Sequence, residues 1–228
     1  MDMKRTFIKI LWGIVPKNLK IQLINFKTLA LDFGQWQSIK KKIPVDKEGD
    51  PIPWYAYPAI EYLKQFDLTD KTTFEWGSGN SSLFWARKAK EIVSIESHKE
   101  WLNIVNKSKL SNQKIFLFEK KDDYVRAILN QNKKFDIILI DGKYRYECAK
   151  IAGKCLSPGG LIILDNSDWF PKTARTLREH NLIQVDFNGF GPINNYTWTT
   201  SLFFSRNFNF KSNQPVQPIG GVRQYGDE

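Results

Sequence analysis

Cysteine and histidine are scarce in this chain of 228 residues, which holds two of each. Cys148 and Cys155 fall in one expected helix, where two helical turns separate them by roughly 10 Å. That separation is too long for a disulfide. No cysteine and histidine cluster has the spacing of a zinc site. We therefore expect both cysteines to be reduced core residues of a cytoplasmic protein, and we give neither His98 nor His180 a catalytic role.

Long hydrophobic runs are also lacking, which excludes a transmembrane helix. Near the N-terminus, two basic residues precede an apolar stretch, but Lys9 interrupts it and no small-residue cleavage site follows, so a signal peptide is not expected. The pattern predicts a short amphipathic helix that ends before Pro16, with Phe7, Leu11 and Ile14 on one face. One interpretation is that this helix packs on its own domain or on a second subunit of a homo-oligomer. The other is that it makes a peripheral membrane contact.

Positive charge is in excess, with a net charge of +10, but it is spread along the chain in short runs such as residues 40–42. This distribution is typical of a solvated surface, with a functional basic patch as the alternative. We therefore do not expect a nucleic acid partner.

The 42% of hydrophobic residues is enough for one sizeable core. We expect a helical or extended accessory segment over residues 1–50, one folded domain over 51–206, and a loosely ordered tail over 207–228.

From residue 72 onward, β-rich runs alternate with helical stretches, which indicates an α/β fold with a parallel sheet covered on both faces. The last two predicted strands form an antiparallel hairpin. The predicted strands are Thr72–Trp76, Ile92–Glu96, Lys114–Phe118, Phe135–Asp141, Leu161–Asp165, Leu182–Phe187 and Thr197–Ser205. The predicted helices are Tyr57–Phe66, Ser81–Lys90, Lys99–Ser108, Asp123–Asn130, Arg145–Leu156 and Lys172–Glu179.

The first of these strands runs into a glycine turn that is followed at once by a helix. Gly77 and Gly79 allow the backbone to turn sharply and to approach a ligand closely. A dinucleotide site has a third glycine, where this chain has Ser82. Glu75 also places a negative charge where a pyrophosphate would be repelled, whereas a cationic cofactor would be attracted. The second strand ends at Glu96, where a carboxylate can accept both hydroxyl groups of a ribose.

These residues, with residues 136–142 and 156–160, resemble class I S-adenosylmethionine-dependent methyltransferases from about residue 57 to residue 206. The resemblance implies a Rossmann-like seven-stranded sheet, mostly parallel, with helices on both faces. It also implies that Glu75, Gly77, Gly79 and Asn80 surround the methionine moiety of S-adenosylmethionine and that Glu96 binds the ribose.

An acid after the third strand usually meets the adenine in that family. Asp122 and Asp123 are both candidates, and the sequence does not separate them. The preceding Lys120-Lys121 pair departs from the small residue that many relatives have there.

The acceptor side is predicted from the ends of the fourth and fifth strands. Asp141, Asp165 and Asn166 form an oxygen set that suits Mg²⁺, and they resemble the ligands of metal-dependent O-methyltransferases. The alternative is that Asp165 and Asn166 cap a helix that begins near Asp168 or Trp169. Without a metal, Asp141 is the expected general base, and Arg145 is available to orient an anionic acceptor.

These features predict methyl transfer from S-adenosylmethionine, at oxygen, to a small-molecule or glycan-type acceptor. Two alternatives stay open. One is methylation of RNA or protein, and the other is a scaffold that holds the cofactor without turnover.

Overall fold

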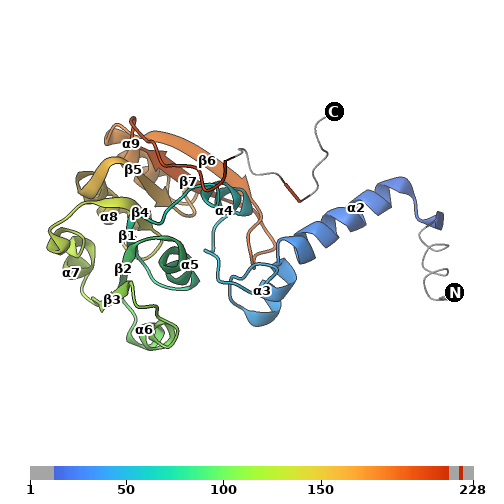
Figure 1. Ribbon diagram of the computed structural model, residues 1–228, viewed down its shortest axis with the longest axis horizontal. Helices are drawn as coiled ribbons and strands as arrows, with labels where there is room; N and C mark the ends of the chain where they lie inside the picture. The colour runs from blue at the N-terminus through green and yellow to red at the C-terminus, as the bar shows by residue number, and fades with distance from the viewer. Residues whose placement is uncertain (1–12, 216–220, 223–228) are drawn as a thin grey trace.

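Seven strands form one mixed sheet in the order β3-β2-β1-β4-β5-β7-β6 (Figure 1). The computed structural model describes residues 13–215, 221 and 222. The strands are β1 (Thr72–Trp76), β2 (Glu91–Glu96), β3 (Gln113–Leu117), β4 (Phe135–Ile140), β5 (Leu156–Leu164), β6 (Ile183–Gly189) and β7 (Trp198–Phe204). The helices are α2 (Lys17–Lys27), α3 (Gln35–Lys41), α4 (Tyr57–Leu63), α5 (Asn80–Lys88), α6 (Lys99–Asn106), α7 (Lys121–Arg126), α8 (Arg145–Cys155) and α9 (Pro171–Glu179).

Strands β1 to β5 are parallel to one another along the sheet, and β7 lies antiparallel between β5 and β6. The predicted fold class is thereby confirmed. The central strands are rich in Ile, Leu and Phe because parallel strands with helices on both faces are buried on both sides. Parallel strands also bring their carboxyl ends to one edge, so the loops after β1, β2, β4 and β5 meet there.

Two apolar cores hold the helices to the sheet. One lies under α7, α8 and α9 and includes Tyr124, Ala149 and Leu177. The other lies under α4 and α5 and includes Ile60 and Trp85.

The two cysteines belong to the first of these cores. Both Cys148 and Cys155 are buried and free, as predicted.

The largest differences from the predicted elements lie around β5 and α7. β5 begins at Leu156, five residues before the predicted start, and its register with β4 shifts between the Phe135–Leu156 and Ile137–Leu161 pairs. α7 ends at Arg126, and a 3-10 helix, Leu129–Gln131, follows it.

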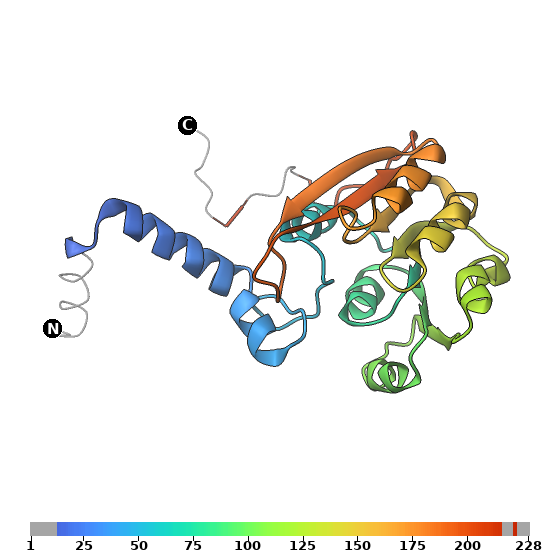
Figure 2. The same ribbon diagram turned by 180° about the vertical axis from the view of Figure 1, so that it is seen from behind.

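The accessory segment is mostly helical. A π-helical turn, Thr28–Asp32, joins α2 to α3. α2 extends away from the rest of the described chain in both views (Figures 1 and 2). The helix predicted before Pro16 falls largely on residues 1–12, outside the described residues. Among the described residues, no helix is long and apolar enough to span a membrane.

The first residues of the predicted tail contact the domain. The Asp67 N–H donates to the Lys211 carbonyl at 2.9 Å. Phe208 and Phe210 pack edge-on against Phe66. Partly buried aromatic rings thus hold residues 207–213 against the domain, a contact that a composition of Asn, Gln, Pro and Gly does not reveal.

Candidate functional site

The turn after β1 packs directly against the turn after β4. Gly77 has a φ of +101°, and a Cβ there would lie 3.1 Å from the Gly142 Cα. A Cβ on Gly142 would lie 2.0 Å from the Tyr124 hydroxyl oxygen. Gly77 therefore has a structural reason to be glycine, because two backbones touch and its conformation is left-handed.

Gly79 is different. Its φ of 170° is extended backbone, which any residue adopts. A Cβ there would have as its nearest neighbour Trp101 Cζ2 at 3.8 Å, an ordinary contact. Nothing within the described chain requires glycine at position 79, so the free space in front of it is available to a ligand.

Glu75 lies beneath this turn and is 1% exposed. Its carboxylate oxygens accept hydrogen bonds from the hydroxyl groups of Ser81, Ser82 and Ser94. Burial raises the pKa of Glu75 to about 7, and the three hydroxyl groups oppose the rise. Glu75 therefore lies buried directly under the glycine turn, where three hydroxyl groups satisfy its carboxylate.

Glu96 is held rigidly at the end of β2. Its Oε1 accepts the backbone N–H groups of Ser97 at 2.7 Å and His98 at 2.9 Å, and its Oε2 accepts the Ser78 hydroxyl at 2.7 Å. Ser78 therefore links the glycine turn to the predicted ribose acid.

A cavity of about 140 Å³ lies at this edge of the sheet. Strand-end residues form one side of it, and the accessory segment forms another. Its lining consists of Lys42, Ile43, Pro44, Trp54, Ser78, Gly79, Asn80, Ser81, Trp101 and Asp141. The predicted residues Gly79, Asn80 and Asp141 are thereby brought together.

The accessory segment is attached to the site by hydrogen bonds. The Asn80 side chain donates to the Pro44 carbonyl at 2.7 Å. The Trp54 indole N–H donates to Asn194 Oδ1 at 3.0 Å, and the Gln35 amide donates to the Gly191 carbonyl at 2.9 Å. Residues 35–54 therefore form a wall of the cavity and join the loop between β6 and β7. The amide of Asn80, predicted near the methionine moiety, is engaged in holding this wall.

Trp101, in the first turn of α6, was missed by the sequence analysis. Its indole N–H donates to the Ser78 carbonyl at 2.6 Å, and its side chain is 41% exposed beside Gly79. The available signal was a tryptophan on the predicted helix that directly follows Glu96.

Arg145 joins the ends of β4 and β5. Its Nη2 donates to the Asp141 carbonyl at 2.8 Å and to Asp141 Oδ1 at 3.0 Å, and its Nε donates to the Gly142 carbonyl at 3.1 Å. Its Nη1 donates to the Asp165 carbonyl and to Asn166 Oδ1, the latter at 3.0 Å. All five N–H donors of a guanidinium are thus engaged. Arg145 holds Asp141 in place, and the expected role of orienting an anionic acceptor does not fit this geometry.

The carboxylate of Asp165 is directed to β7. Its Oδ1 accepts the Trp198 indole N–H at 3.0 Å and the Thr200 hydroxyl. Burial and the negative charge of Asp141 raise the pKa of Asp165. Burial also raises the pKa of Asp141, and the Arg145 guanidinium opposes the rise. We therefore assign the proton to Asp165 at neutral pH and the negative charge to Asp141, beside its arginine.

These contacts do not fit the predicted magnesium site. The oxygens of Asp141 and Asn166 face a guanidinium, and Asp165 accepts protein donors instead. Within the described part of the chain, no group of three or more His, Cys, Asp or Glu side chains is placed to hold a metal ion.

The alternative, helix capping, is not observed either. α9 begins at Pro171, and no side-chain hydrogen bond caps it.

The two adenine candidates lie apart from this cavity. Asp122 and Asp123 are exposed in the first turn of α7 and are absent from the cavity lining. The structure therefore leaves the choice between them open.

Tyr55 is a second residue that the sequence analysis missed. It is fully buried, and its hydroxyl makes no hydrogen bond of normal geometry with the described residues. Burial and the nearby charges of Asp141, Glu75 and Asp165 raise the pKa of Tyr55 well above its ordinary value. A neutral phenol therefore lies among the three acids of the site.

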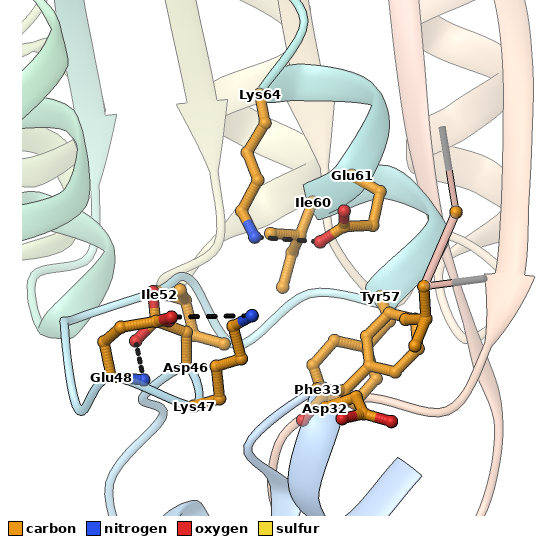
Figure 3. A pocket seen from close by; sticks show the side chains of 12 residues that line it. Asp32, Phe33, Asp46, Lys47, Glu48, Ile52, Tyr57, Ile60, Glu61 and Lys64 are labelled. Carbon is orange, nitrogen blue, oxygen red and sulfur yellow. Dashed lines mark hydrogen bonds and ion pairs between the residues drawn. The ribbon is translucent and has the colours of Figure 1, made fainter. Parts of the chain in front are cut away.

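A second cavity, of about 220 Å³, lies between the accessory segment and α4 (Figure 3). Its two lysines are already paired, Lys64 with Glu61 at 2.8 Å and Lys47 with Glu48 at 3.6 Å. Its lining includes no strand residue. It therefore lacks the strand-end groups on which the chemistry above depends.

Comparison with solved structures identifies the fold. The chain resembles a precorrin-6y C5,15-methyltransferase from Geobacter metallireducens with a TM-score of 0.53 and 14% sequence identity, over 64% of this chain and 86% of that one. The chain has the class I methyltransferase fold.

Two other solved structures are similar at lower scores. A methyltransferase from Pyrococcus furiosus has a TM-score of 0.49 and 16% identity, over 67% of this chain and 83% of that one. The N-methyltransferase NodS from Bradyrhizobium japonicum, in complex with S-adenosylhomocysteine, has a TM-score of 0.45 and 14% identity, over 60% and 79%. The sequence matches no protein-family model and no curated protein.

Burial of the ionised Glu75 carboxylate lowers the stability of the folded protein. Its pKa is raised above the ordinary value of 4.5 to about 7. The folded state therefore binds the proton more tightly than the unfolded chain does. Stability that is fully present at low pH is lost as the pH rises between these two values, by about 3 kcal/mol for a shift of this size.

We expect the melting temperature to fall between about pH 4.5 and pH 7, and Glu75→Gln to flatten that fall. Differential scanning fluorimetry across a pH series measures the melting temperature of both proteins. Glu61→Gln, at an exposed ion pair, is the control that should leave the slope unchanged. Equal slopes for Glu75→Gln and the unmodified protein would contradict the assignment.

Proposed function

We propose that this protein transfers a methyl group from S-adenosylmethionine to an oxygen of a small-molecule or glycan-type acceptor in the cytoplasm. One observation carries the proposal. The open glycine turn, the fixed carboxylate of Glu96 and the half-buried carboxylate of Asp141 meet at the carboxyl edge of a class I methyltransferase sheet.

The residues of the edge fit the proposed donor. Gly79 leaves space at the cavity, and Glu96 with Ser78 offers oxygen acceptors for ribose hydroxyl groups. Glu75 and Asp141 supply negative charge for the ammonium and sulfonium groups, in a buried setting where charge is screened weakly. Either Asp122 or Asp123 would meet the adenine.

The cavity must enlarge to admit a nucleoside, because ligand sites commonly measure about 300–1,000 Å³. The Trp101 indole lies beside Gly79 and obstructs the cavity there, and its N–H donates to the Ser78 carbonyl. We infer that Trp101 moves when the donor binds and then covers it.

Asp141 is the proposed general base. S-Adenosylmethionine, when bound, supplies an electrophilic methyl group. Asp141 would accept the proton of the acceptor hydroxyl while the new C–O bond forms and the C–S bond breaks. Arg145 keeps the carboxylate ionised and fixed in direction, and the protonated Asp165 avoids a second charge beside it.

The cavity wall supports the proposed acceptor class. Trp54 and Trp101 are both more than 40% exposed beside polar backbone and Asp141. A sugar ring has an apolar C–H face and a polar rim, which suits flat indoles flanked by hydrogen-bonding groups.

The first test concerns the donor. We expect calorimetry to show far tighter binding of S-adenosylmethionine or S-adenosylhomocysteine than of NAD. Gly79→Val should abolish binding because its side chain extends into the ligand space, and it should leave the melting temperature nearly unchanged because the chain has room at this position.

The matched control is Gly142→Ala, which should lower stability by about 1–3 kcal/mol through overpacking against Tyr124. Tight binding of NAD, or undiminished binding of S-adenosylhomocysteine by Gly79→Val, would contradict the donor assignment.

The second test concerns the base and the metal. In a screen of hydroxylated acceptors with labelled S-adenosylmethionine, we expect turnover to survive EDTA, because Arg145 already fills the place between the predicted ligands. Asp141→Asn should lower turnover about 10²–10⁴-fold and keep most donor affinity.

Two results would overturn this account. Loss of turnover with EDTA and its return with Mg²⁺ would restore the metal hypothesis. Donor binding without turnover on any acceptor, RNA and protein included, would indicate a scaffold.

A further inference from the structure

We propose that α2 docks the protein on an anionic membrane surface. The proposal starts from the exposure of this helix. None of residues 17–27, all of which the structure describes, is buried, and Leu19, Ile21, Leu23 and Phe26 are each at least 42% exposed. α2 runs directly into the π-helical turn Thr28–Asp32, so the helical backbone is continuous past Lys27. The exposed apolar side chains of α2 are what call for a partner.

The apolar residues of α2 form a usable face. Leu19, Leu23 and Phe26 follow the i, i+4, i+7 spacing that places side chains on one side of a helix. Lys20 and Lys27 lie next to that face, where long side chains can reach lipid headgroups while their stems contact the apolar layer.

The positive charge of residues 3–31 favours an anionic partner. Residues 3–31 contain six lysine and arginine residues and no aspartate or glutamate. A second copy of α2 would bring like charges together with no acid to pair them. An anionic lipid surface is complementary to this charge along its whole length.

The surface continues past α2. Trp36, Ile39 and Ile43 are 59%, 49% and 41% exposed, and residues 40–42 are lysines beside them. Lys42 and Ile43 also line the cavity at the sheet edge, so docking through this surface would place the cavity near the lipid headgroups. Both views show α2 projecting from the α3 end of the molecule (Figures 1 and 2).

Co-sedimentation of the full chain with vesicles tests the proposal. We expect binding to vesicles of phosphatidylcholine mixed with phosphatidylserine, little binding to phosphatidylcholine alone, and weaker binding as salt increases. The triple variant Leu19→Gln, Leu23→Gln, Phe26→Gln should lose binding. The triple variant Lys17→Gln, Lys20→Gln, Lys27→Gln should weaken it roughly 10- to 100-fold.

A matched control removes the same charge elsewhere. Lys107→Gln, Lys109→Gln, Lys114→Gln changes exposed lysines near β3 and should bind as the unmodified protein does. Equal loss in this control would reduce the effect to net charge and overturn the docking role of α2.

Sedimentation velocity without lipid provides the competing outcome. A dimer that dissociates in the Leu19, Leu23 and Phe26 variant would assign the helix to a second copy of the chain and overturn the membrane proposal. Because no readout uses the cofactor or an acceptor, failure here leaves the methyltransferase proposal untouched.

Discussion

A single guanidinium balances the buried charge on which the site depends. Arg145 reaches from the start of α8 to the ends of β4 and β5 and engages all five of its donors there. It lies among acids whose burial raises their pKa values. Removing one partner of such a pair leaves an uncompensated charge, which costs far more than the pair contributes. The arginine therefore fixes both the shape of the edge and the protonation of its carboxyl groups.

We expect this arrangement to favour a cationic ligand at the sheet edge. Asp141 carries the negative charge beside Arg145, Glu75 lies buried under the glycine turn, and the protonated Asp165 and the neutral Tyr55 add no positive charge. A site of fixed dipoles and charges in a weakly screening interior needs little reorganisation when a charged ligand binds. The proposed sulfonium donor has the charge that such a site stabilises, and the pyrophosphate of a dinucleotide has the opposite one.

The sequence predicted those parts of the molecule that local pattern determines. Alternating apolar runs located every strand of the sheet, and glycines at 77 and 79 with acids at 75 and 96 located the proposed donor edge. Contacts between distant segments were not predictable in this way. The packing of residues 207–213 depends on Phe66, and the cavity wall depends on a bond between Asn80 and Pro44. Likewise, the sequence placed Asp141, Asp165 and Asn166 at the ends of neighbouring strands, but it did not reveal that Arg145 donates hydrogen bonds to Asp141 and Asn166.

A crystal structure of the complex with S-adenosylhomocysteine tests the central claim most directly. The account predicts the ribose hydroxyl groups on Glu96, the thioether near Gly79, the Trp101 indole displaced from the Ser78 carbonyl, and the Asp141–Arg145 pair retained. A ligand bound in the cavity beside α4, or a complex in which Trp101 still donates to Ser78 while Glu96 contacts no ligand atom, would contradict it.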